Sequence, residues 1–193
     1  LLTTILGALY LINNVDDLDL EGKMRKTIRF AALPFLAVFL GWTAILLCKD
    51  GFAAGADGVI SMEPYKYLHN LVQMPAVLAM FLVGVVLVLA AIWYGAFTQR
   101  RRGIWFGGAG TVLVVMSVFF VAGFNGTSYY PSFSDLQSSL TLANSSSSRF
   151  TLFVMSCVSL LIPFVLAYIV YAWRQMDKSR ITSEEMKVNK DLY

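Results

Sequence analysis

Hydrophobic positions in this chain gather in long uncharged runs, and the charged residues lie almost entirely between them. Phe30–Cys48 and Phe150–Trp173 contain no Asp, Glu, Lys or Arg, and neither do the longer runs Tyr67–Gln99 and Gly103–Ser134. A helix rises about 1.5 Å per residue, so even the shortest run reaches roughly 28 Å, the thickness of a bilayer's hydrocarbon core. Four such runs cannot all be buried in one small soluble core, and the pattern therefore predicts transmembrane helices.

The predicted fold class is an all-α polytopic transmembrane helical bundle that forms a single membrane domain over residues 1–193. The composition agrees, because a chain that is 58% hydrophobic and 14% charged has too little charge to cover a soluble surface. The predicted spans are approximately 1–15 (partial), 29–48, 71–97, 103–124 and 150–173, followed by a tail, 174–193. The first segment is too short to cross unaided and lacks the basic start of a signal peptide. We therefore expect the sequence to be the C-terminal fragment of a larger subunit.

Basic residues are distributed unequally between the segments that connect these runs. The segment 16–29 holds four, 98–103 holds three and the tail from Arg174 holds five, whereas the two intervening segments together hold three. Lys and Arg concentrate in cytoplasmic loops. The split of twelve basic residues against three therefore predicts that 16–29, 98–103 and the C-terminal tail are cytoplasmic. Each basic cluster adjoins a predicted span, which argues against nucleic acid as a partner.

The first connecting segment mixes acids and bases, and we interpret it as a solvated loop with local ion pairs. Its aspartates, Asp16, Asp17 and Asp19, lack the glycine and the terminal glutamate of a calcium loop. The two cysteines, Cys48 and Cys157, form neither a CxxC motif nor a cluster with histidine. We therefore interpret both cysteines as packing residues and predict no metal site.

Two further patterns concern helix ends. Pro64 suits the first turn of a helix, and a helix from there to Gln99 would be about 50 Å long, longer than a bilayer core. Its first turns, which include His69, are therefore expected at the outer interface, with the span starting near Leu71. In the tail, the capping-box sequence 182–185 predicts the start of a short helix.

Few residues interrupt the apolar character of the spans. Each proline in a span lacks an N–H and predicts a bend or a local loosening of its helix: Pro34, Pro75 and Pro163. Small residues on one face of a span predict a close helix contact: Gly103, Gly107 and Gly110. No charged side chain lies in the middle of a predicted span. Since ion and proton pathways need ionisable groups at depth, this argues against the catalytic part of a pump, channel or transporter.

The last third of the chain contains several short motifs. They are the outer-loop SLT at 139–141, the serine pairs after it, TL..M at 151–155, the tyrosines of the last span and the terminal Leu192-Tyr193. Together with the opening Ala8-Leu9-Tyr10-Leu11 and the charged segment after it, they resemble subunit II of cytochrome bd-type quinol oxidases, in its C-terminal part. Ala143-Asn144 stand where that family commonly has an aspartate.

This resemblance implies a nine-span subunit with two four-helix bundles and a ninth helix beside them. The chain would hold the end of the fifth span and the four spans after it, a four-helix bundle with one additional C-terminal helix. It also implies a haem-free, non-catalytic subunit that supports quinol oxidation coupled to reduction of dioxygen to water, in the bacterial cytoplasmic (inner) membrane. The implied partners are a haem-bearing subunit I and membrane lipids, and a small accessory subunit is left open.

No residue of this chain is predicted to be catalytic or to bind a cofactor or metal, and the chain alone is expected to be inactive. The chain has one histidine, His69, and Met74 would follow it on the same continuous helix. Five helical residues rotate the side chain of Met74 by about 140° from that of His69, so the two could not bind one iron. Ligation of an iron by His69 with Met116 or Met155 of another span is left open, and a hydrogen-bonding role is favoured. The alternative function is a structural or transporter-type bundle subunit without a respiratory role.

Overall fold

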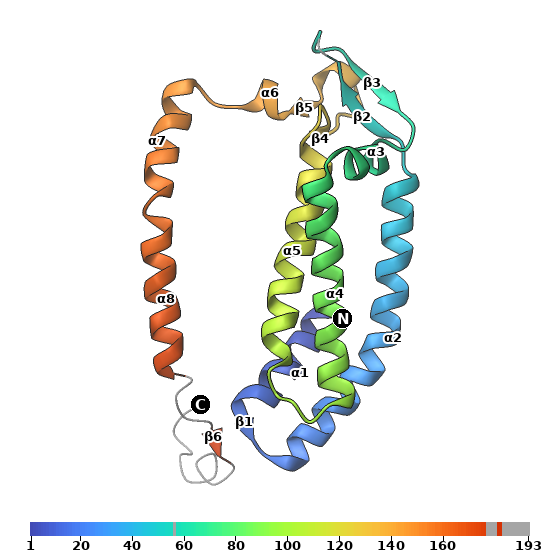
Figure 1. The fold of residues 1–193 in the computed structure, drawn as a ribbon. Helices are drawn as coiled ribbons and strands as arrows, with labels where there is room; N and C mark the ends of the chain where they lie inside the picture. The colour runs from blue at the N-terminus through green and yellow to red at the C-terminus, as the bar shows by residue number, and fades with distance from the viewer. Residues whose placement is uncertain (56, 177–180, 183–193) are drawn as a thin grey trace.

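The computed structural model describes residues 1–55, 57–176 and 181–182, and long apolar helices dominate them (Figure 1). Within this part of the chain, four segments are long and apolar enough to cross a membrane. They are α2 (Leu18–Cys48), α4 (Pro75–Phe97), α5 (Gly103–Gly123) and the pair formed by α7 (Arg149–Ser159) and α8 (Ile162–Met176). This arrangement confirms the predicted all-α polytopic class.

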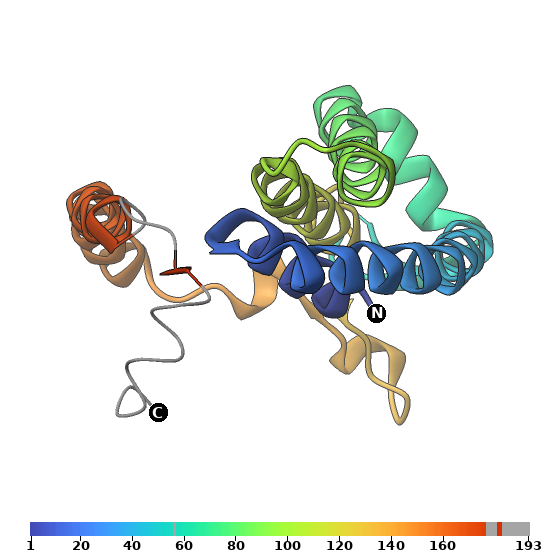
Figure 2. The same ribbon diagram turned by 90° about the horizontal axis from the view of Figure 1, so that it is seen from below.

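The bundle is formed by α2, α4, α5 and the shorter apolar helix α1 (Leu2–Asn14), which packs against α2 and α5. The buried core lies where α1 meets the other helices. Its members are Ile5, Ala8, Leu9 and Ile12 of α1, Ile28 and Ala31 of α2, and Val88, Ala91, Ile92 and Ala96 of α4. The α7–α8 pair stands apart from these helices in both views, and none of its residues is buried (Figures 1 and 2). It is the additional C-terminal helix.

Glycines allow α4 and α5 to approach backbone to backbone. A Cβ on Gly110 would lie 2.8 Å from both Gly84 O and Val88 N, and a Cβ on Gly84 would lie 2.9 Å from Val114 N. Gly107 is equally close to its neighbours, since a Cβ there would lie 2.8 Å from Leu6 Cδ2 of α1. The close contact predicted for the face of α5 is confirmed.

The helix α2 begins earlier than predicted, at Leu18, and this corrects the interpretation of the segment 16–29. Asp17 is its N-cap, and the Oδ1 atom accepts hydrogen bonds from the N–H groups of Asp19 at 2.8 Å and Leu20 at 3.0 Å. The charged residues after it are therefore helical, and Glu21 and Arg25 are buried. The prediction of a solvated loop is wrong because the helix cap and mutual charge pairing favour a helix, whereas the local ion pairing predicted with it is confirmed by Glu21 and Arg25.

The prolines act differently at each position. Pro75 is the first residue of α4, and Met74 before it has φ −111° and ψ 79°, which separates α4 from α3 (Lys66–Gln73). The continuous helix predicted from Pro64 is therefore wrong. Pro163 follows the turn that interrupts α7 and α8, so the loosening predicted there is confirmed. Pro34 lies inside the uninterrupted α2, which changes direction along its length (Figure 1).

One end of the bundle carries short strands, and we call it the sheet end. There β2 (Gly51–Ala54) and β3 (Ile60–Glu63) form an antiparallel hairpin, and β4 (Ser128–Tyr130) pairs with β5 (Leu140–Thr141), with the 3-10 turn η1 (Leu136–Ser138) and α6 (Leu142–Ser145) beside them. A bridge from Ala53 to Thr127 joins the two pairs. The opposite end, which we call the charged end, has β1 (Val15–Asp16) in parallel with β6 (Ile181–Thr182).

Two other sequence-based interpretations concern residues away from the core. The thiols of Cys48 and Cys157 are both exposed on the chain. Within the part of the chain that the structure describes, neither cysteine is buried in a packed interface, so the interpretation as packing residues is wrong there. The short helix predicted from the capping-box sequence in the tail lies at residues outside the described ones.

The glycine contact between α4 and α5 gives a matched pair of substitutions. Gly110→Ala should lower the stability of the assembled protein by about 1–3 kcal/mol, because its methyl group would meet the backbone of α4, which cannot rotate away. Gly108→Ala is the control, since a Cβ at Gly108 meets nothing within 4 Å. Thermal denaturation in detergent compares the two. Equal stability of both variants would contradict the backbone contact.

Candidate functional site

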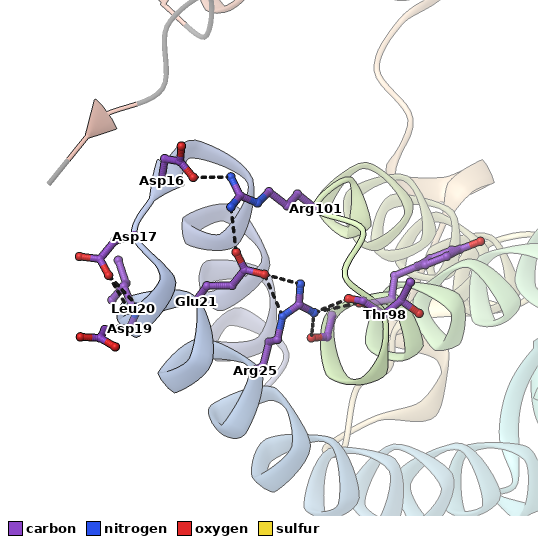
Figure 3. Close-up of polar contacts among 10 residues, drawn as sticks. Asp16, Asp17, Asp19, Leu20, Glu21, Arg25, Thr98 and Arg101 are labelled. Carbon is purple, nitrogen blue, oxygen red and sulfur yellow. Dashed lines mark hydrogen bonds and ion pairs between the residues drawn. The ribbon is translucent and has the colours of Figure 1, made fainter.

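Four charged side chains form a cluster at the charged end of the bundle and join separate segments of the chain (Figure 3). Arg101, between α4 and α5, donates from Nη1 to Asp16 Oδ1 at 2.8 Å, and its Nη2 lies 3.1 Å from Glu21 Oε2. Arg25 donates to Glu21 Oε1 from Nε at 3.1 Å and from Nη2 at 2.7 Å. Each carboxylate oxygen of Glu21 is thus held by a different guanidinium group.

Arg25 also closes the C-terminal end of α4. Its Nη1 donates to Gly95 O at 2.8 Å and to Tyr94 O at 3.3 Å, and it contacts Thr98 O as well (Figure 3). The last carbonyl groups of a helix have no partner within the helix and carry its partial negative charge. A guanidinium group satisfies both needs, so Arg25 ties α2 to the end of α4.

The cluster is balanced in charge, and its inner pair, Glu21 and Arg25, is buried. The side chains of Glu21 and Arg25 are only 8% and 11% exposed, and two carboxylates face two guanidinium groups. The hydrogen bond that Arg101 donates to Asp16, followed by the charge of Glu21, raises the pKa of Arg101 above its usual value. Removing charges from water is costly unless they are paired and hydrogen-bonded, as they are here. The geometry is that of a joint between helices.

Sequence reasoning missed this cluster because it assigned the segment to solvent. One local signal was present: Glu21 and Arg25 are four residues apart, the spacing of a favourable ion pair on a helix. Asp17 before them is a suitable N-cap residue. The contribution of Arg101 carries no local signal, since it comes from far along the chain.

A second polar joint closes the sheet end and was also missed. Asn70 of α3 is fully buried, and its Nδ2 donates to Val121 O at 2.8 Å and to Thr127 Oγ1 at 2.6 Å. Asn125 donates to Asn70 Oδ1 at 3.1 Å. The side chain of Gln137 binds the backbone of β3: it accepts a hydrogen bond from Ile60 N and donates one to Ile60 O, both at 2.9 Å. These amides join β3 and α3, which precede α4, to the end of α5 and the segment after it.

His69 lies on α3, outside the spanning segments, with its side chain half exposed. Its Nδ1 is 2.9 Å from Glu63 Oε1, and Lys66 Nζ is 2.9 Å from Glu63 Oε2. These two partners, His69 first, hold the pKa of Glu63 below its usual value. The hydrogen-bonding role expected for His69 is confirmed. Met74 lies in the break after α3, so the 140° angle derived from a continuous helix does not apply.

The residues of this chain do not fit a haem bound between two axial ligands inside the bundle. Such a haem takes histidine with histidine or methionine. The chain has one histidine, and it lies at the sheet end, outside the spanning segments. No group of three or more His, Cys, Asp or Glu residues among those described could hold a metal ion.

The bundle also contains an apolar hollow of about 520 Å³ between α2, α4 and α5. Phe35, Phe39, Val88, Val114 and Phe119 are among the residues that line it, and no histidine, cysteine or carboxylate does. Such a lining suits an apolar group and supplies no ligand for a metal.

A family of known proteins matches nearly all of the described chain. Residues 1–176 match the family described as cytochrome bd terminal oxidase subunit II. The chain belongs to this family. It is therefore a multi-pass membrane subunit of a respiratory oxidase complex, and the resemblance found in the sequence motifs is confirmed. No curated protein matches the chain.

Substitutions of the buried pair Glu21 and Arg25 should have strongly non-additive effects on the stability of this oxidase subunit. Arg25→Gln should destabilise the assembled complex by about 3 kcal/mol, because it leaves the carboxylate of Glu21 with one guanidinium group and opens the end of α4. The double variant Glu21→Gln/Arg25→Gln should recover part of this loss, since it buries no excess charge. Thermal denaturation of the complex measures both.

The exposed neighbour Lys26 provides the control for that cycle. Lys26→Gln removes the same charge one residue away and should change stability little, as surface charges usually do. If Arg25→Gln were as mild as Lys26→Gln, the cluster would not be a stabilising joint.

Proposed function

We propose that this chain is a haem-free, non-catalytic part of subunit II, which supports quinol oxidation coupled to the reduction of dioxygen to water. The haems then belong to a partner subunit I, and quinol is a substrate of the complex. The observation that supports this proposal is the position of His69, which lies on α3, outside the spanning segments. A chain with no other histidine lacks the usual ligands for a haem at membrane depth.

The two polar joints support a scaffolding role. The charged cluster closes one end of the bundle and the buried Asn70 closes the other, while the helices between them present apolar surface. Neither joint leaves a group of the kind that would react with a substrate. No catalytic residue is assigned to this chain, and the chain alone is expected to be inactive.

Exposed apolar helices indicate where partners lie. The α7–α8 pair buries none of its residues against the rest of the chain. In a membrane complex such surfaces are covered by lipids or by neighbouring subunits. The proposed partners are the haem-bearing subunit I and membrane lipids, with a small accessory subunit left open.

The proposed location is the bacterial cytoplasmic (inner) membrane, with the charged end and the C-terminus in the cytoplasm. Arg25 and Arg101, from two of the basic segments, meet in one cluster, so these segments share one side of the bundle. The pairing of β1 with β6 brings residues 181–182 of the tail to the same end. Positively charged loops on one side indicate the cytoplasmic face.

The haem-free proposal is tested in the assembled oxidase with His69→Ala. Every haem absorbance band should persist at the unsubstituted ratio to protein, with oxygen consumption largely retained, because no iron ligand is removed. His69→Gln is the control, since an amide can still hydrogen-bond to Glu63 and so separates local damage at the sheet end from loss of a ligand. Specific loss of one haem in both variants would overturn the proposal.

The orientation is tested with reporter fusions in the full-length subunit. A reporter active only in the cytoplasm should be active after Tyr193, and one active only outside the cytoplasm should be silent there. A reporter of the second kind should be active when inserted near Gly55 or Ser146, at the sheet end. The reverse pattern would invert the assignment of both ends.

A further inference from the structure

A hollow of about 520 Å³ opens at the charged end, between the end of α4 and the start of α5. Three consecutive arginines line it together with two aromatic rings and one glycine: Arg100, Arg101, Arg102, Tyr94, Phe106 and Gly103. The hollow adjoins the balanced cluster and shares the side chain of Arg101 with it.

Two of these arginines have no carboxylate partner among the residues that the structure describes. Arg101 is engaged by Asp16 and Glu21, whereas Arg100 and Arg102 are exposed and form no ion pair with any residue that the structure describes. The Arg100 guanidinium lies 6.0 Å from the centre of the Tyr94 ring, a contact that leaves its N–H groups free for an anion. Guanidinium groups match phosphate oxygens with paired hydrogen bonds.

The start of α5 adds to the positive potential of the hollow. The 21-residue helix begins at Gly103, and its N-cap residue Arg102 provides no side-chain acceptor for the first N–H groups. Unsatisfied N–H groups and the helix dipole favour an anion at this position.

The walls of the hollow continue into apolar surface along the spans. Tyr94 and Phe106 stack with their ring centres 5.4 Å apart. Trp93, Phe97 and Trp105 beside them are each more than 60% exposed. Exposed tryptophans at the end of a span are typical of the membrane interface, where headgroups lie. A ligand with both a phosphate group and hydrocarbon chains would use both surfaces, whereas a free phosphate ion would use only one.

We propose that this hollow binds the phosphate group of an anionic phospholipid, with Arg100 and Arg102 as the contacting residues and the acyl chains along Trp93 and Trp105. The inference rests on the charges and shape of this end of the bundle and does not depend on whether the chain carries a haem. The positive-inside rule predicts only a general excess of basic residues on one side of the membrane. The proposal instead places one lipid at one site.

The first test uses the assembled oxidase in nanodiscs that contain phosphatidylglycerol and phosphatidylcholine, followed by native mass spectrometry of the lipids retained on release. Arg100→Gln/Arg102→Gln should lower retained phosphatidylglycerol by about one molecule per complex and leave phosphatidylcholine unchanged. The control is Lys23→Gln/Lys26→Gln, which removes two exposed cations from the start of α2, outside the hollow. The control should retain phosphatidylglycerol as the unsubstituted complex does.

Equal loss in the two double variants would overturn the proposal, because it would show a diffuse attraction between cations and the membrane. Retention of phosphatidylglycerol by Arg100→Gln/Arg102→Gln would overturn it as well. Displacement of the lipid by excess inorganic phosphate would contradict the role given to the acyl chains.

A second measurement needs no substitution and so remains decisive if the arginine variant fails to assemble. The unsubstituted complex is irradiated with a photoactivatable phosphatidylglycerol that carries its reactive group near the headgroup. Adducts in this chain should concentrate in residues 93–106 and should decrease when unlabelled phosphatidylglycerol, but not phosphatidylcholine, is added. Adducts spread evenly over the ends of all the spans would overturn the proposal.

Discussion

The carboxylate of Glu21 is held between two guanidinium groups, one from its own helix and one from the connection between α4 and α5. Because Arg25 also binds the last carbonyl groups of α4 and Arg101 also binds Asp16 after α1, the cluster around this carboxylate joins these segments at the charged end. A buried charge is stable only when its partners are in place. The ends of the helices must therefore meet correctly for the cluster to form.

Between the two ends, packing rather than polar contact holds the bundle together. Lipid chains are as apolar as leucine, so helices in a membrane gain little from burying apolar surface against one another. Close approach of small residues provides the attraction instead, and Gly84 and Gly110 bring the backbones of α4 and α5 into contact. The fully buried Asn70 then closes the sheet end with hydrogen bonds to α5 and to the loop after it.

This distribution of polar groups suits the structural role that we propose for this subunit. The polar joints lie at the ends of the bundle, and the apolar hollow among the spans offers no ligand for a metal. The surfaces left open are apolar, as on α7 and α8, or positively charged, as around Arg100 and Arg102. Both kinds of surface are ready for the other components of a membrane complex: neighbouring helices and phospholipids.

The sequence by itself determined the spans, the glycine face of α5 and the break before Pro163, because each depends on local properties. Hydrophobic length, the absence of a side chain and the missing N–H of proline act within a few residues of the chain. The sequence also carried the family motifs, which can be recognised without tertiary information.

Tertiary structure decided the rest. Glu21 is paired with Arg101, eighty residues away along the chain. The hydrogen-bond partners of Asn70 lie in α5 and in the loop after it, about fifty residues away. Such contacts have no local pattern, since their energy comes from groups that meet only after the helices have packed.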